Sequence, residues 1–301
     1  MLFFRPIQIE DIETITAFTF QGGFLNCDYA FANMCSWRFL YDSEYAILDR
    51  FLFIRFYVEI KERKQLAYMF PVGNGDLKQA ITRMEKDAEA SGHSFLILGV
   101  TAENKKKLDM IFPAKFSFIP ERDYYDYIYL REDLVTLKGK KYQSKRNHIN
   151  RFNKQYDYVY LPITMEIINN CKALEQVWFE ANKAPDNKED LFHERCSMNF
   201  AMNHFNELGL LGGAIVVNDT IIAFTYGSPI NHATFGIHVE KADVRYEGVF
   251  SVINQEFVKQ IPPQYVYINR EEDLGIPGLR KSKLSYHPHL LLEKNSATWR
   301  Y

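Results

Sequence analysis

The sequence predicts an α/β protein made of two tandem domains, and three observations support this prediction. The chain has 301 residues, which is long for one domain and comfortable for two. Hydrophobic residues make up 47% and aromatic residues 15% of the chain, so it can fill a large core with side chains that favour strands. Two stretches about 170 residues apart show the same order of predicted strands and helices.

The first stretch predicts the order β-β-β-α-β-α-β. Its long helix is the clearest element, because Asp76 can cap it, Gly92 can end it, and apolar residues recur at helical spacing between them. The remaining elements are expected as strands at 44–48, 51–60, 65–71, 95–100 and 124–130 and a short helix at 103–112.

The second stretch predicts the same order, although no sequence identity links the two. Pro262 and Pro263 end its long helix at 249–260. The other elements are expected as strands at 210–217, 220–228, 234–240, 265–269 and 289–292 and a short helix at 279–284, with two further helices between 165 and 208. We therefore expect an N-terminal domain at 1–131, a basic linker at 132–160 and a C-terminal domain at 161–301 that carries the site.

Charge, cysteine content and apolar runs limit the classes of protein to which the chain can belong. The net charge of −2 gives no global signature of a nucleic-acid or membrane-surface protein. The four cysteines form no C-x-x-C pair and are expected to be reduced core thiols: Cys27, Cys35, Cys171 and Cys196. The N-terminal apolar stretch is too short for a signal peptide, and the longest apolar runs have strand length. We expect a cytoplasmic monomer without a membrane partner.

The order of elements resembles that of the acetyltransferase superfamily, the GNAT fold. In that fold the fourth strand and the following helix splay away from the fifth strand and leave backbone N–H groups free to bind a pyrophosphate or a carbonyl. Members that use acetyl-CoA carry a loop of the form [RQ]-x-x-G-x-[GA] at this turn. Here the turn reads Arg245-x-x-Gly248-x-Phe250, so the bulky Phe250 weakens the acetyl-CoA interpretation. An ordinary helix start is the alternative.

Two charged segments are further candidates for a site. The segment 269–288 follows a predicted core strand and combines many ionisable residues with a Gly-Ile-Pro-Gly turn, a setting in which α/β proteins build sites. The segment 138–154 carries seven Lys or Arg residues and no acidic residue, which suits phosphate or an RNA backbone. Solvated loops or an exposed linker helix would explain the same residues. His287-Pro288-His289 lacks a third ligand, so we expect no metal site.

These segments together resemble one family across nearly the whole chain, the bacterial group related to the C-terminal catalytic domain of lysylphosphatidylglycerol synthases. The resemblance is carried by Lys140-Lys141-Tyr142-x-x-Lys145-Arg146-Asn147-x-Ile149-Asn150-x-Phe152, by His238-Val239-Glu240-Lys241-Ala242-Asp243, by Ile268-Asn269-Arg270-Glu271-Glu272-Asp273-Leu274-Gly275 and, most specifically, by Gly278-Leu279-Arg280-Lys281-Ser282-Lys283-Leu284-Ser285-Tyr286-His287-Pro288. It implies a tandem acetyltransferase-like fold shared with the Fem-type peptidyltransferases.

The resemblance implies acyl transfer, and we expect an aminoacyl group to pass from aminoacyl-tRNA to an acceptor. The lysyl-lipid synthases use a lipid hydroxyl, but this sequence shows no membrane-spanning stretch, so we expect a soluble small-molecule amine or hydroxyl instead. No cofactor is firmly implied, and the donor would be either aminoacyl-tRNA or an acyl-CoA. The candidate bases or amine binders are Glu240, Asp243 and Glu272. The candidates for holding phosphate, carboxylate or an RNA backbone are Arg245, Gly248, Arg270, Arg280, Lys281, Lys283, Lys145 and Arg146. The alternatives are an acetyl-CoA-dependent N-acetyltransferase and a ligand-binding protein without catalytic activity.

Overall fold

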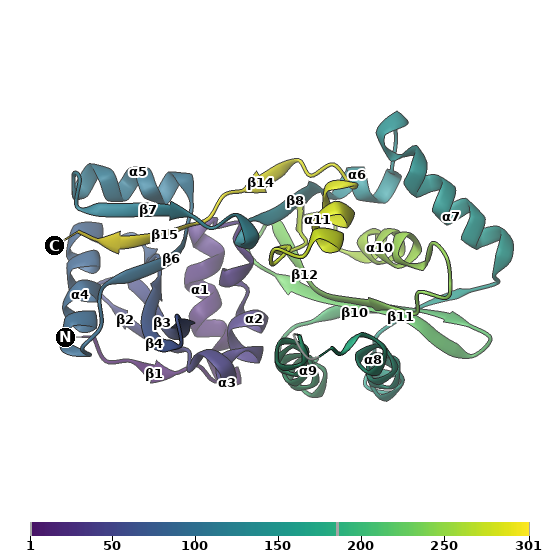
Figure 1. Cartoon of the computed structure of the whole chain (residues 1–301), viewed down its shortest axis with the longest axis horizontal. Helices are drawn as coiled ribbons and strands as arrows, with labels where there is room; N and C mark the ends of the chain where they lie inside the picture. Colours follow the sequence, from purple (N-terminus) through teal and green to yellow (C-terminus); the bar gives the residue numbers. More distant parts are fainter. Residues whose placement is uncertain (1, 185–186, 301) are drawn as a thin grey trace.

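Two β-sheets, each covered by helices, form the protein in the computed structural model, which describes residues 2–184 and 187–300 (Figure 1). The α/β class predicted from the sequence is therefore confirmed. One sheet has eight strands and the other seven, and each mixes parallel with antiparallel pairs.

The first sheet has the strand order β1-β2-β3-β4-β6-β15-β7, and β5 pairs with β3. Its strands are β1 (Arg5–Pro6), β2 (Glu44–Leu48), β3 (Phe51–Ile60), β4 (Arg63–Met69), β5 (Val72–Gly73), β6 (Leu96–Val100), β7 (Phe116–Pro120) and β15 (Asn295–Trp299). Its helices are α1 (Ile12–Gly22), α2 (Phe31–Ser36), α3 (Arg38–Tyr41), α4 (Leu77–Ala90) and α5 (Ala102–Ile111). As predicted, Asp76 caps α4 by accepting a hydrogen bond from the backbone N–H of Gln79.

The second sheet has the order β14-β8-β13-β12-β11-β10-β9. Its strands are β8 (Asp126–Leu130), β9 (Val159–Pro162), β10 (Leu211–Val217), β11 (Thr220–Pro229), β12 (Thr234–Ala242), β13 (Tyr267–Asn269) and β14 (Leu290–Leu292). Its helices are α6 (Arg131–Thr136), α7 (Gln143–Gln155), α8 (Ile168–Asn182), α9 (Lys188–Asn203), α10 (Val249–Gln260) and α11 (Pro277–Leu284). The predicted helix at 249–260 and the two helices between 165 and 208 are confirmed as α10, α8 and α9.

The two sheets exchange one strand each, which the sequence did not predict. β8 lies within the expected first domain (1–131) but pairs with β13 and β14 of the second sheet. β15 lies near the C-terminus but pairs with β6 and β7 inside the first sheet. Figure 1 shows the yellow segment after β14 running from the second sheet back to the first. The expected boundary at residue 131 therefore does not separate the two sheets.

The segment 132–160 is not an independent linker. It contains most of α6, all of α7 and the start of β9, and two apolar residues of α7, Ile149 and Phe152, belong to the core that α10 covers. This burial explains why a segment with so many basic residues folds as part of the second domain: its apolar side chains pack into the core, and most of its charged side chains lie outside.

Each sheet contains a single parallel pair among the described residues, β4–β6 in the first and β12–β13 in the second. The β12–β13 pairing covers three residue pairs and ends at Gly236 and Asn269, after which the two chains diverge. A β-bulge at His238 lies just beyond this point, because Tyr226 pairs with Val239 whereas Gly227 pairs with Ile237. The bulge changes the alternation of side chains, so that Ile237 and Val239 point into cores on opposite faces of the sheet.

Candidate functional site

The divergence of β12 from β13 places charged side chains at the carboxyl ends of a parallel strand pair, where open α/β sheets commonly bind ligands. Glu240 is on β12 and Arg270 follows β13, and Arg270 Nη2 lies 3.1 Å from Glu240 Oε1. Both side chains are largely buried, with exposed fractions of 13% and 9%. The second oxygen of Glu240 has a weaker contact, 3.4 Å from Asn254 Nδ2 of α10.

Lys145 of α7 lies near this ion pair and is the third charged residue of the candidate site. Its Nζ lies 3.9 Å from the centre of the Tyr286 ring, and the guanidinium of Arg270 lies 4.8 Å from the same ring. Burial and the nearby charge of Arg270 lower the pKa of Lys145 to about 8, while Glu240 acts in the opposite direction. Lys145 therefore exchanges its proton near physiological pH.

Arg270 has hydrogen-bonding capacity left in this environment. Its Nη1 is buried and has no hydrogen-bond partner among the described residues. Burial disfavours its charged form, yet Glu240, Tyr129 and Tyr286 keep the pKa of Arg270 above its ordinary value. A guanidinium that stays charged with one buried N–H group free is ready to receive an acceptor atom from a ligand.

Lys283 holds the loop that carries Arg270. Its Nζ donates hydrogen bonds to the main-chain carbonyl of Arg270, at 2.5 Å, and to that of Glu272. Burial lowers the pKa of this lysine, although Glu271 and Glu272 favour its charged form. Lys283 is thus a positioning residue in the fold, not a free ligand for phosphate.

Asp273 anchors the other end of the loop and is completely buried. It accepts hydrogen bonds from Arg122 at 2.9 Å, from Arg280 at 2.7 Å and from the Tyr127 hydroxyl at 2.6 Å. Burial alone would raise the pKa of Asp273, but these donors and the Gly275 N–H hold it well below its usual range. Arg280 is therefore engaged in the fold and does not point into the candidate site.

A second polar network lies on the opposite face of the second sheet. Ser228 Oγ lies 2.7 Å from His238 Nε2, and His238 Nδ1 lies 2.8 Å from Glu271 Oε1. Asn33 of α2 donates to the same oxygen of Glu271 at 2.7 Å, so the network links the two sheets. The backbone φ of Glu271 is +58°, a left-handed conformation that turns successive side chains of the loop to different sides.

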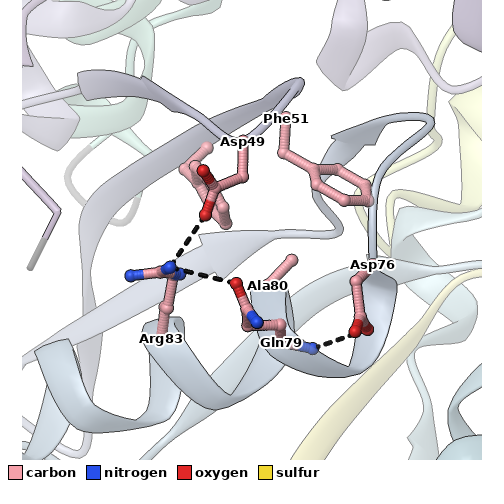
Figure 2. Close-up of a pocket in the computed structure, with 7 residues that line it drawn as sticks. Asp49, Phe51, Asp76, Gln79, Ala80 and Arg83 are labelled. Atoms are coloured by element: carbon pink, nitrogen blue, oxygen red, sulfur yellow. Dashed lines mark hydrogen bonds and ion pairs between the residues drawn. The ribbon is translucent and has the colours of Figure 1, made fainter.

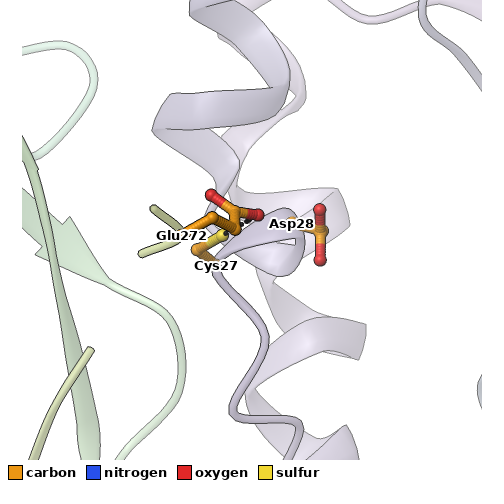
Figure 3. A group of neighbouring side chains, drawn as sticks. All are labelled: Cys27, Asp28 and Glu272. Atoms are coloured by element: carbon orange, nitrogen blue, oxygen red, sulfur yellow. Dashed lines mark hydrogen bonds between the residues drawn. The ribbon is translucent and has the colours of Figure 1, made fainter. Parts of the chain in front are cut away.

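Glu272, predicted as a catalytic candidate, lies in a third cluster at the junction of the sheets. Lys294 binds its carboxylate at 2.5 Å, Asp126 at 2.9 Å and Asp28 at 3.0 Å. Figure 3 shows Cys27, Asp28 and Glu272 as neighbours, and their potential ligand atoms lie within 4.8 Å of one another. Burial raises the pKa of the Cys27 thiol, however, and the Lys294 ammonium already supplies the positive charge. We assign this cluster to the structure of the junction.

The predicted loop at the start of α10 has a different arrangement from a cofactor site. Asp243 and Arg245 pair with each other at 2.5 Å, and the Arg245 side chain is 79% exposed. Gly248 has a φ of +91°, and a Cβ there would lie 2.7 Å from the carbonyl oxygen of His148 in α7. The backbone of α7 therefore packs directly against the helix N-terminus at which acetyl-CoA enzymes would bind pyrophosphate.

The remaining predicted residues separate into structural and exposed positions. Arg146 donates to the main-chain carbonyls of Leu137 and Gly139 and fixes the turn before α7. Lys281 is exposed on α11. Of the candidates predicted from the sequence, the structure thus brings together Glu240, Arg270 and Lys145, whose catalytic or binding roles remain predictions.

Several residues of these networks were not predicted. Tyr286 and Tyr129 supply the aromatic walls around Arg270, at 4.8 Å and 5.9 Å from its guanidinium. Lys294 lies a few residues beyond the end of the predicted segment 269–288 and belongs to no motif. His238 stands two residues before Glu240 in the sequence. Its position in a β-bulge is the one local feature by which the residue pattern of the strand could have identified it.

Two hollows lie in the first domain, away from these networks. Figure 2 shows the smaller one, where Arg83 donates hydrogen bonds to Asp49 and Gln79; its volume of about 10 Å³ suffices for about one water molecule. The larger, of about 300 Å³, is lined by Phe24, Phe70 and Lys107 among others, and Lys107 pairs with Glu103 at its rim. Neither hollow contains a predicted site residue.

Comparison with known proteins supports the resemblance found in the sequence. The family described as "Phosphatidylglycerol lysyltransferase, C-terminal" matches residues 23–297. A conserved protein of unknown function from Bacteroides thetaiotaomicron is 51% identical over 100% of both chains, with a TM-score of 0.96. An uncharacterized protein of Mycoplasmoides gallisepticum is 25% identical over 172 residues, which are 56% of this chain and 54% of that protein. The matched region thus spans about half of the length of that relative.

Two more distant structures define the fold. L-PGS of Bacillus licheniformis is 15% identical, with 95% of this chain and 91% of that chain covered and a TM-score of 0.64. FemX is 8% identical, with 98% and 96% covered and a TM-score of 0.63. The predicted tandem acetyltransferase-like fold, related to the Fem type, is confirmed. Among the described residues, none of the helices combines the length and the apolar composition needed to cross a bilayer.

Proposed function

The chain belongs to the phosphatidylglycerol lysyltransferase C-terminal family, whose relatives are acyltransferases, and on this premise we propose that it transfers an aminoacyl group from aminoacyl-tRNA to a soluble amine or hydroxyl acceptor. The observation that carries the proposal is the cluster of Glu240, Arg270 and Lys145 at the divergence of β12 and β13. It combines a carboxylate, a buried guanidinium and an amine whose pKa is lowered to about 8.

The proposed reaction needs a group that takes a proton from the acceptor. The acceptor nitrogen or oxygen attacks the ester carbonyl of the aminoacyl-tRNA, the bond between that carbonyl and the ribose oxygen breaks, and the ribose leaves as a hydroxyl. The proton lost by the acceptor passes through Glu240 to the departing ribose oxygen. Glu240 suits this role because its Oε2 has only the weak contact with Asn254.

The basic outer face of α7 supports the choice of an RNA donor. Lys154 of α7 is exposed, as are Lys138 and Lys140 just before that helix, and charges of this kind bind phosphate backbones without base specificity. α7 also contributes Lys145 to the candidate site, so a tRNA bound along this helix would bring its acceptor end close to Glu240. The packing of His148 against Gly248 argues against an acetyl-CoA donor at the start of α10.

The test is a transfer assay with two donors. Bacterial tRNA charged with labelled amino acids and labelled acetyl-CoA would be incubated separately with the protein and a panel of soluble amines and alcohols. The proposal expects label in the acceptor pool from charged tRNA, with Glu240→Gln lowering the rate by about 10²-fold or more. The exposed Glu207 gives a matched control, Glu207→Gln, which should keep the full rate.

Two outcomes would contradict the proposal. Transfer from acetyl-CoA alone would establish the acetyltransferase alternative. Binding of charged tRNA that depends on Glu240 or Arg270, but without release of the amino acid or its appearance in any acceptor, would establish a binding protein without catalytic activity.

A further inference from the structure

The buried charges of the candidate site do not balance. Lys145 and Arg270 are both cationic below pH 8, and Glu240 is the carboxylate whose charge acts on both of them. Arg270 Nη2 is engaged with that carboxylate, whereas its Nη1 has no partner. Lys145 has no carboxylate within ion-pair distance among the described residues and contacts the Tyr286 ring instead.

An unpaired positive charge in such a place is costly without a ligand. A buried N–H group of a guanidinium without an acceptor loses the hydrogen bonds that water would have given it. The two aromatic rings, Tyr129 and Tyr286, exclude water from one side of Arg270 and offer no carboxylate. The surroundings therefore favour an additional negative group more strongly than an exposed pair of cations would.

We propose that Arg270 Nη1 and Lys145 Nζ form a subsite for one oxyanion, a carboxylate or phosphate group carried by a substrate. Both cations contact the same Tyr286 ring, and Lys283 fixes the main chain at Arg270. The existence of the subsite does not depend on the proposed acyl transfer. Its role in that reaction rests on the proposed function: the subsite would bind either an anionic group of the acceptor or the phosphate of the donor's terminal nucleotide.

Anion binding is measured with the whole protein by its effect on thermal unfolding. Sodium phosphate and sodium acetate are compared with sodium chloride at matched ionic strength and pH 7.0, because a ligand that binds the folded state raises the midpoint by mass action. We expect phosphate or acetate to stabilise the protein beyond chloride, and the stronger of the two identifies the chemical class of the substrate group. No extra stabilisation by either would overturn the proposal.

Two substitutions make the test specific. Lys145→Gln should weaken the binding of the effective anion about tenfold, whereas Lys106→Gln, the same change at an exposed lysine of α5, should leave it unchanged. Glu240→Gln should strengthen binding severalfold, because it removes the competing negative charge but retains an oxygen for Arg270. Equal anion effects in both lysine variants, or weaker binding in Glu240→Gln, would also overturn it.

The source of the oxyanion is resolved by adding cytidine and adenosine monophosphates to the comparison. Stronger stabilisation by these nucleotides than by phosphate points to the donor's terminal nucleotide, and equal or weaker stabilisation points to the acceptor. The two proposals fail separately. Anion binding without acyl transfer would contradict only the proposed function, and acyl transfer without Lys145-dependent anion binding would contradict only the subsite.

Discussion

The ammonium of Lys283 lies 2.5 Å from the main-chain carbonyl oxygen of Arg270, so one buried charge on α11 fixes the residue at the centre of the candidate site. The same ammonium holds the carbonyl of Glu272. Lys283→Met should therefore destabilise the protein by about 2–3 kcal/mol, since two buried carbonyls would lose a charged donor. Urea unfolding measures this loss.

The neighbouring Lys281 gives a control on the same helix. It is exposed, so Lys281→Met should change the unfolding free energy by less than about 0.5 kcal/mol. If the two variants unfold at the same urea concentration, Lys283 does not hold the loop in the way the structure indicates.

Lys145 should limit stability at neutral pH. Its pKa is lowered from 10.5 to about 8 in the folded protein, so the unfolded chain binds more protons between these values and stability rises with pH across them. Lys145→Gln should raise the unfolding free energy by about 1 kcal/mol at pH 7, with solvent screening considered, and the gain should vanish near pH 10.5. Thermal unfolding from pH 7 to pH 10.5, with Lys154→Gln as control, checks the sign. A loss of stability at pH 7 would contradict it.

Asp273 should stabilise the folded protein at neutral pH, whereas Lys145 should destabilise it. Its folded pKa lies below the unfolded value, so its stabilisation is complete at neutral pH and is lost as pH falls through the folded pKa. Asp273→Asn should cost about 3 kcal/mol at pH 7, and the difference from the unsubstituted protein should shrink in acid. Asp243→Asn, at the pair with the exposed Arg245, should cost less than about 1 kcal/mol. Urea unfolding between pH 7 and pH 3 would refute the assignment if the two variants lost equal stability.

Gly248 should tolerate no side chain. Gly248→Ala would place a Cβ 2.7 Å from the carbonyl oxygen of His148 in a left-handed backbone conformation. We expect a loss of about 2 kcal/mol in unfolding free energy. Gly278→Ala is the matched control, because a Cβ there meets nothing within 4 Å and alanine favours the helix α11. A stable Gly248→Ala protein would mean that α7 can move away from α10.

Local sequence signals predicted most helices and strands because capping residues, prolines and apolar spacing act over a few positions. The cap at Asp76 and the stop at Pro262 are of this kind. They could not predict the exchange of β8 and β15, because strand partners are chosen by packing between distant segments. The residues of β8 do not distinguish a strand of one sheet from a strand of the other, and four of its five residues are buried in the structure.

Local sequence signals also predicted only part of the candidate site. Three separate segments supplied the residues that the fold brings together: Glu240 before the long helix, Arg270 in the charged segment 269–288 and Lys145 in the basic segment 138–154. The segment 269–288 also supplied Arg280, Lys283 and Glu272, whose charges are satisfied by partners from other elements. Charge alone does not reveal whether a side chain has a partner in the folded protein, and that distinction separates a positioning residue from a ligand-binding one.

The position of β15 between β6 and β7 has a consequence for synthesis on the ribosome. The interior of the first sheet stays incomplete until residues 295–299 have been translated, although every other strand of that sheet lies before residue 121. An emerging N-terminal half would expose unpaired edges of β6 and β7 throughout translation of the second half, a period in which such edges invite chaperone binding or aggregation. The two halves therefore mature together, and a fragment that ends before β15 would lack the strand that joins β6 to β7.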